Sequence, residues 1–209
     1  MLHNLESLNE SSVLATDGEI GRVCNFLFDD QSWTIRYLVV DVRKWLDRHD
    51  VLLAISAVEL PDWDKKAFPV HLTKDQVRRS PDVDTKKPVS RQQEIAMKEY
   101  YQWPAYWHDS EFPPLPSGPT GTEFPLHTKE DPHLRSAWAL ADYEVCAADG
   151  AVGRLKDYIM DDASWHIGYL DVKAGDWLHG RSMLVPTRSV QSISWADYRV
   201  NLRPTREGI

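Results

Sequence analysis

The chain has 209 residues, of which 42% are hydrophobic and 27% are charged, a composition typical of a globular protein rather than a disordered one. Its formal net charge of -8 argues against a nucleic-acid partner, because binding to a phosphate backbone requires a basic surface. No apolar run approaches the ~20 residues that cross a bilayer, and the first residues lack a signal-peptide pattern. We therefore expect a cytoplasmic protein without membrane insertion.

An internal repeat relates the two halves of the sequence at an offset of 132 residues. Between Ala15 and Val58, 17 of 44 positions are identical to the residues 132 further along, without a gap. Beyond this region, a two-residue deletion is expected to bring Val70 and Leu72 onto Val200 and Leu202. Tryptophans recur in both copies and are expected to serve packing of the shared fold: Trp33/Trp165, Trp45/Trp177 and Trp63/Trp195.

Each copy is predicted to consist of short β-strands joined by turns. The Asp17-Gly18 pair, like Asp149-Gly150, predicts a hairpin with a type I′ turn, in which Gly supplies the positive φ. The strands expected in the first copy are rich in β-branched and aromatic residues or alternate in polarity, and they cover Ile20 to Phe28, Trp33 to Val42, Val51 to Ile55 and Val70 to Leu72, with Leu14 in a first strand. Five or six strands in roughly 65 residues favour closure into a small barrel, which leaves no open edge.

Two motifs resemble those of the PRC-barrel domains. One is Asp-Gly-x-x-Gly-Arg, at Asp17 to Arg22 and Asp149 to Arg154; the other is Asp-Asp-x-Ser-Trp-x-Ile-x-Tyr-Leu, at 29–38 and 161–170. The family includes the cytoplasmic part of the photosynthetic reaction-centre H subunit, the C-terminal domain of a ribosome-maturation factor and stand-alone bacterial proteins linked to stress. The resemblance implies a mainly β chain with two small PRC-type barrels in tandem, at residues 1–80 and 139–209.

Residues 81–138 match nothing in the second half and are expected to separate the barrels. Pro88, Ser90 and Pro104 predict a short helix from Arg91 to Tyr101, with Ser90 as its N-cap. Residues 112–125 are rich in Pro, Gly, Ser and Thr and predict an extended linker.

A dense aromatic cluster follows the expected helix and contains Tyr100, Tyr101, Trp103, Tyr106 and Trp107. These side chains have two interpretations. They fold back over an apolar face of a barrel, within the chain or in a dimer, or they anchor a partner protein, since aromatic residues dominate binding hot spots. A similar segment follows the barrel in stand-alone bacterial proteins of the family that this sequence resembles.

The candidate chemical groups are expected to be structural. Asp29-Asp30 and Asp161-Asp162 are the best paired carboxylates for acid/base or metal chemistry, but adjacent aspartates in a turn commonly bond their own backbone. Arg22 and Arg154 are expected to be buried or half-buried and paired with carboxylates such as Asp17 and Asp149, with anion binding as the alternative. Cys24 and Cys146 are expected to be buried and apolar rather than a redox pair.

The sequence contains no recognisable catalytic, cofactor-binding or metal-binding motif. The histidines lack the spacing of zinc ligands, and there is no nucleophile elbow, phosphate-binding loop or dinucleotide fingerprint. The leading hypothesis is a non-enzymatic scaffold with an unidentified protein partner, involved in stress or complex assembly. The alternatives are an accessory protein of a membrane complex, like the reaction-centre H subunit, and a small-ligand or metal-binding sensor. Pairing of the two barrels within the chain is expected, and a homo-oligomer remains open.

Overall fold

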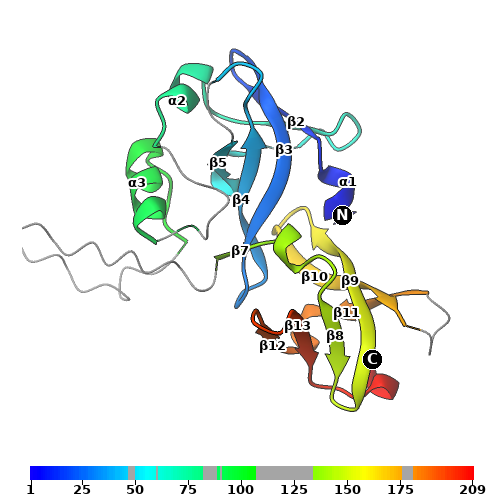
Figure 1. Ribbon diagram of the computed structural model, residues 1–209. Coiled ribbons are helices and arrows are strands. Elements are labelled where there is room, and N and C mark those ends of the chain that lie inside the picture. The colour runs from blue at the N-terminus through cyan, green and yellow to red at the C-terminus, as the bar shows by residue number, and fades with distance from the viewer. Residues whose placement is uncertain (47–49, 60, 82–88, 90, 107–133, 176–180) are drawn as a thin grey trace, which may run out of the picture.

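The computed structural model describes residues 1–46, 50–59, 61–81, 89, 91–106, 134–175 and 181–209. It is mainly β, and its strands form one continuous 13-stranded sheet with few helices (Figure 1). We call residues 1–81 the first half and residues 134–209 the second half. The expectation of a mainly β chain is confirmed.

The first half contains most of the strands that the sequence predicts. Its elements are β1 (Leu2–Asn4), α1 (Leu5–Leu8), β2 (Ser12–Ala15), β3 (Gly18–Asp29), β4 (Thr34–Asp41), β5 (Asp50–Ala54), η1 (Ile55–Ala57), β6 (Ala67–Pro69) and α2 (Lys74–Arg78), and α3 (Arg91–Tyr101) follows them. The predicted helix over residues 91–101 is thus confirmed. Its expected cap, Ser90, lies outside the described residues, as do Trp107 and the expected linker over residues 112–125.

The elements of the second half follow the same order as those of the first, except that β12 is a strand where the described residues of the first half form only isolated bridges. These elements are β7 (Leu134–Ser136), η3 (Trp138–Leu140), β8 (Glu144–Ala147), β9 (Gly150–Asp161), β10 (His166–Ala174), β11 (Ser182–Pro186), η5 (Thr187–Ser189), β12 (Val190–Ser194), β13 (Arg199–Leu202) and η6 (Arg206–Gly208). The sheet order, β12-β13-β8-β9-β10-β4-β3-β2-β6, places corresponding strands on either side of the β10–β4 junction. The fold of the two halves is therefore one motif used twice.

The offset of 132 residues continues to the end of the repeat, so the expected two-residue deletion is wrong. Val13 pairs with Phe68 in the parallel β2–β6 ladder, and Val145 pairs with Val200 in the parallel β8–β13 ladder. Val200 is thus the counterpart of Phe68, not of Val70. The alignment was wrong here because it matched apolar residues by type. Which residues of the two repeats are equivalent is defined by the hydrogen-bond register of the ladders.

Two details of the strands also differ from the sequence prediction. The turn between β2 and β3 has Thr16 and Asp17 at its centre, and only Gly18 takes a positive φ, at 132°. A type I′ turn needs two central residues with positive φ, so the hairpin is confirmed but its turn type is not. The last strand is Ala67–Pro69 rather than Val70 to Leu72, because the parallel ladder with β2 ends at Pro69.

The halves join through a reciprocal pair of backbone hydrogen bonds. The Ile35 amide donates to the Trp165 carbonyl at 2.9 Å, and the Ile167 amide donates to the Trp33 carbonyl at 2.7 Å. Since each bond is the other shifted by 132 residues, a pseudo-twofold axis passes between β4 and β10. Both tryptophans have positive φ, 52° and 56°, an uncommon conformation for a bulky residue that both copies share.

Each half also extends a short arm onto the other half. Strand β1 pairs with β9 of the second half, and its counterpart β7 pairs with β3 of the first half. Figure 1 shows α1 and the N-terminus close to the β9–β10 end of the second half. The correspondence between the halves therefore extends back to Leu134, the counterpart of Leu2.

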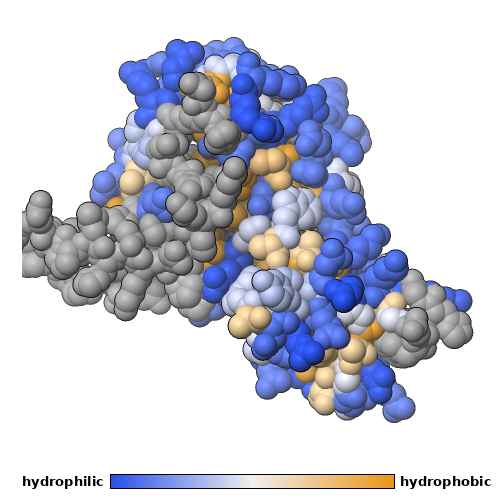
Figure 2. Space-filling model, viewed as in Figure 1, coloured by the Kyte–Doolittle hydropathy of each residue, from blue (hydrophilic) through white to orange (hydrophobic). Residues whose placement is uncertain are grey.

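The buried apolar residues of both halves belong to one cluster. It runs from Val13 and Phe68 in the first half to Val145 and Val200 in the second, with Phe28 and Tyr158 in contact across the junction at 6.0 Å between ring centroids. In Figure 2, apolar side chains reach the surface around the level where the two halves meet. Exchanged arms and a shared core thus join the two halves extensively.

Candidate functional site

The described part of the aromatic cluster, residues 100–106, folds back onto the first half. We call it the aromatic segment. Trp103 is 9% exposed and stacks on Tyr101 with ring centroids 4.2 Å apart, and both belong to or pack against the core. Tyr100 is the most exposed of the set, at 38%, and its hydroxyl donates to the Gln76 carbonyl at 2.8 Å. The aromatic segment thus covers an apolar face of its own chain.

A buried carboxylate on α3 holds this cover in place. Glu94 is 1% exposed, and its Oε1 accepts hydrogen bonds of 2.7 Å from the hydroxyls of both Tyr37 and Tyr106. The Arg36 guanidinium lies over the Tyr106 ring at 4.2 Å. Sequence reasoning missed Glu94 and Tyr37. The available signal was the spacing of Glu94, Met97 and Tyr101, which places a Glu on the helix face that also carries two apolar residues.

Beneath the aromatic segment lies a cavity of about 310 Å³ between the halves. Its lining comes from three parts of the chain: Arg36, Tyr37 and Ile55 of the first half, Lys98 of α3 with Tyr106 of the aromatic segment, and Trp165 of the second half. This lining combines aromatic and aliphatic walls with two cationic side chains. It has the chemistry to hold a small apolar molecule with a negative group rather than to activate a nucleophile.

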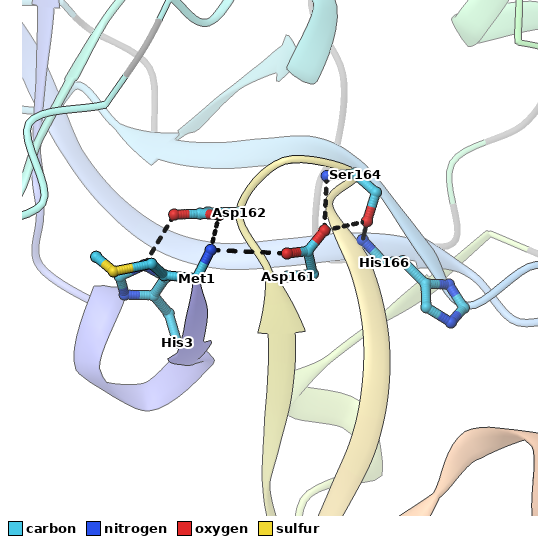
Figure 3. Close-up of polar contacts among 6 residues, drawn as sticks. All are labelled: Met1, His3, Asp161, Asp162, Ser164 and His166. Carbon is cyan, nitrogen blue, oxygen red and sulfur yellow. Dashed lines mark hydrogen bonds and ion pairs between the residues drawn. The ribbon is translucent and has the colours of Figure 1, made fainter.

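The paired aspartates serve the turns and the junction of the two halves. Asp29 accepts from the amides of Gln31 and Ser32, both at 2.9 Å, and so closes its own turn. Its counterpart Asp161 bonds the amide and hydroxyl of Ser164 in the same way, as Figure 3 shows. These bonds lower the pKa of Asp161, the Ser164 hydroxyl bond contributing most.

The second aspartate of each pair reaches the arm exchanged from the other half. Asp162 contacts His3 Nε2 at 3.3 Å, together with the terminal amine of Met1 (Figure 3). At the equivalent place, Asp30 accepts from Arg135 Nε at 3.2 Å. His3 and Arg135 are equivalent residues of the two repeats, 132 residues apart. The contact between the second aspartate of a pair and the exchanged arm, which we call the carboxylate clamp, therefore occurs twice.

Each arm residue of the clamp also rests on a repeated tryptophan. The His3 ring stacks on Trp63 with centroids 4.0 Å apart, and the Arg135 guanidinium lies 4.4 Å from the centre of the Trp195 ring. Arg135 gains both ion-pair attraction to Asp30 and cation–π attraction to the indole face, whereas His3 adds ring stacking to its hydrogen bond with Asp162. This contact gives Trp63 and Trp195 a role at the junction of the halves, beyond packing inside each copy.

The arginines of the first motif do not make their expected ion pairs. Arg22 donates to the Glu10 carbonyl at 3.0 Å and Arg154 to the Asp142 carbonyl at 2.9 Å, and both arginines are exposed. Asp17 instead accepts from the Lys74 amide at 2.8 Å. The expected pairing of Arg22 with Asp17 is therefore wrong. In both copies, the guanidinium donates a hydrogen bond to the carbonyl of a residue held at positive φ, Glu10 or Asp142.

The cysteines are free and half-buried, not fully buried as expected. Burial raises the pKa of Cys24 to about 12, with the nearby carboxylates of Asp50 and Asp41 adding to the effect. Burial also raises the pKa of Cys146. The raised pKa leaves each thiol less ionised at neutral pH than an ordinary cysteine, which disfavours nucleophilic reactivity.

Within the described ranges, no three His, Cys, Asp or Glu side chains gather where they would hold a metal ion. The helices of that same part of the chain are all too short or too polar to cross a membrane. Compared with protein families and with curated proteins, the sequence gives no match to either.

Proposed function

We propose that this chain is a non-enzymatic scaffold of the PRC-barrel type, in which two small tandem barrels joined by a Pro-rich linker bind a protein partner. The resemblance of both copies to the PRC-barrel motifs supports the assignment. So does the reciprocal junction, since a duplicated module that pairs about a pseudo-twofold axis imitates a homodimer within one chain. The candidate carboxylates and arginines are engaged in turns and in the junction, which fits a structural use of both motifs.

One observation carries the proposed binding role. In the first half, the outer face of β4 and β5 is covered by α3 and the aromatic segment, and Tyr37 is 5% exposed. In the second half, the counterpart Tyr169 is 37% exposed. A large aromatic side chain that is buried in one copy and more than a third exposed in the other marks a surface available to another molecule.

The experiment is capture of the tagged full chain from its own host under gentle conditions, followed by reconstitution with the purified candidate. The proposal expects a partner in stoichiometric amount that forms the same complex from purified components. If no protein is recovered at that level, and none reconstitutes, the scaffold role is refuted.

A second candidate function is a small-ligand sensor, and the 310 Å³ cavity beneath the aromatic segment is the observation that favours it. A ligand held between the halves would stabilise the fold by an amount that grows with its concentration. A thermal-shift screen of small carboxylates and aromatic acids tests this, with Arg36→Gln as the comparison, because loss of that guanidinium removes the nearest cation on β4. A shift that the variant retains in full would exclude this cavity as the site.

A further inference from the structure

The outer faces of the two halves differ in what covers them. We call the open face the surface of β10 and β11 formed by Tyr169, Asp171, Lys173, Leu184 and Pro186. These residues share one side of the sheet, because Tyr169 pairs with Pro186 and Asp171 with Leu184 in the antiparallel ladder. Their counterparts in the first half are, in the same order, Tyr37, Val39, Asp41, Leu52 and Ala54, whose register is identical.

Exposure separates the two faces clearly. Leu52 is 1% exposed in the first half, whereas its counterpart Leu184 is 52% exposed in the second. Next to Tyr169, a Cβ built on Gly168 would meet no atom within 4 Å, although Arg36 at the equivalent place stacks on Tyr106. The open face therefore has room where the first half carries its cover.

The covered face shows which chemistry fits a surface of this shape. An amphipathic helix lies on it, and the helix supplies a carboxylate to the hydroxyl of Tyr37 at 2.7 Å. Tyr169 presents the same hydroxyl on the open face, together with the apolar surface of Leu184. An occupant with a helical apolar stripe and one well-placed carboxylate would satisfy both.

Charge sets the open face apart from the rest of the chain. Lys173 is exposed there and takes the place of Asp41 of the first half, and Arg188, exposed in η5 just after β11, takes the place of Ser56. Asp171 is 7% exposed and is paired with Lys156, with 3.8 Å between Nζ and Oδ2. The exposed charge on this face is thus basic, on a chain whose net charge is -8, and it complements an acidic partner.

We propose that the open face docks an acidic amphipathic helix of a partner protein, and that a carboxylate of that helix accepts a hydrogen bond from the Tyr169 hydroxyl. This inference rests on the proposed scaffold function and names its surface and the class of its partner. The pseudo-twofold axis would place this helix in the position that α3 holds on the first half.

The probe is a synthetic peptide of residues 91–106 of this chain in which Arg91 and Lys98 are replaced by Glu, added to the full protein. It reproduces the covering helix and its following aromatics, and it is acidic. Binding is followed by fluorescence anisotropy and should weaken at high salt. The affinity should fall about tenfold in Tyr169→Phe, because one hydrogen bond is lost, and binding should be abolished in Leu184→Asp. Tyr37→Phe is the matched control and should leave the affinity unchanged, because α3 already occupies that face.

Absence of binding at millimolar peptide, or binding that both Tyr169→Phe and Leu184→Asp leave intact, overturns the proposal. A monomer–dimer equilibrium in sedimentation that Leu184→Asp abolishes would identify a second copy of this chain as the occupant, and would also overturn it. Leu184 is half exposed, so an unchanged unfolding curve of that variant checks that only the surface was altered. If a captured partner still binds Leu184→Asp protein, the scaffold function stands and only this docking face fails.

Discussion

Replacement of Gly21 by Ala should destabilise the protein far more than a usual surface substitution. A Cβ at this position would lie 2.0 Å from the Asp41 carbonyl oxygen, on the neighbouring strand. Contacts this short do not occur, so β3 and β4 must separate by about 1 Å. Loss of two ladder hydrogen bonds at about 1 kcal/mol each, added to an overpacking cost of about 1–3 kcal/mol, gives a total of about 3–5 kcal/mol.

Urea denaturation followed by tryptophan fluorescence measures the effect, which should lower the midpoint by about 1 M or more. Gly153 is the counterpart, since its Cβ would lie 2.1 Å from the Lys173 carbonyl oxygen, and Gly153→Ala should cost a similar amount. The control is Gly168→Ala, where the new methyl meets open space and the change should be neutral or stabilising by up to about 1 kcal/mol. A wild-type midpoint for Gly21→Ala, or a large difference between the Gly21 and Gly153 variants, would refute the equivalence of the two strand crossings.

Three further predictions follow from buried titratable groups. Because the pKa of Cys24 is raised to about 12, iodoacetamide should label Cys24 of the native protein about a thousandfold more slowly than an ordinary thiol at about pH 8, and more slowly than Cys146. Equal labelling rates of the two cysteines, measured by peptide mass spectrometry, would contradict this. Burial raises the pKa of Asp157, so the folded state holds this proton more tightly and its favourable contribution is lost as the pH rises through the raised pKa. Asp157→Asn, which copies Asn25 of the first half, should therefore increase stability more at about pH 8 than at about pH 3, and an equal gain at both would argue against the buried carboxyl. Glu94→Ala should cost about 2–4 kcal/mol in urea unfolding, because two tyrosine hydroxyls lose their shared acceptor, whereas Glu94→Gln should recover part of that loss. An Ala variant as stable as the wild type would show that the two hydrogen bonds contribute nothing.

The sequence was most informative where a pattern is local. The Asp-Gly hairpins, the long strands β3 and β4, and helix α3 between its proline boundaries all follow from turn chemistry, β-branched runs and helix-end signals. These features depend on a few neighbouring residues, so they can be read without knowledge of the tertiary fold.

The exchange of arms could not be predicted, because β1 and β7 are three residues long and have no detectable period. Between residues 2 and 8, only Leu2 and Leu8 are identical to their counterparts in the second half. Which strand such a segment joins is decided by packing at the junction, not by its own sequence. The positive φ of Trp33 could not be predicted either, because the reciprocal hydrogen bonds across the pseudo-twofold axis hold a conformation that a tryptophan alone disfavours.

The buried Glu94 escaped prediction for a different reason. Glutamate is almost never fully buried unless it is paired, and its two tyrosine partners are 57 and 12 residues away. The sequence alone therefore gives little sign that this Glu is buried. In the structure, Trp103 is 9% exposed, and Glu94 bonds one tyrosine of β4 and one of the aromatic segment.

The difference between the two outer faces also limits how strongly the open face can bind. Full burial of a Leu or a similar side chain contributes about 1.5–3 kcal/mol, and Leu184 and Tyr169 are already partly buried, so together they offer about 3 kcal/mol. That corresponds to an affinity weaker than millimolar if nothing else is gained. A useful complex must therefore draw on the Tyr169 hydroxyl and on the exposed charges of Lys173 and Arg188, whose attraction decreases as salt is added. The first half avoids this limit because α3 is tethered to the face that it covers, at a high effective concentration. The same fold thus supports a permanent cover on one side of the pseudo-twofold axis and a reversible, salt-sensitive contact on the other.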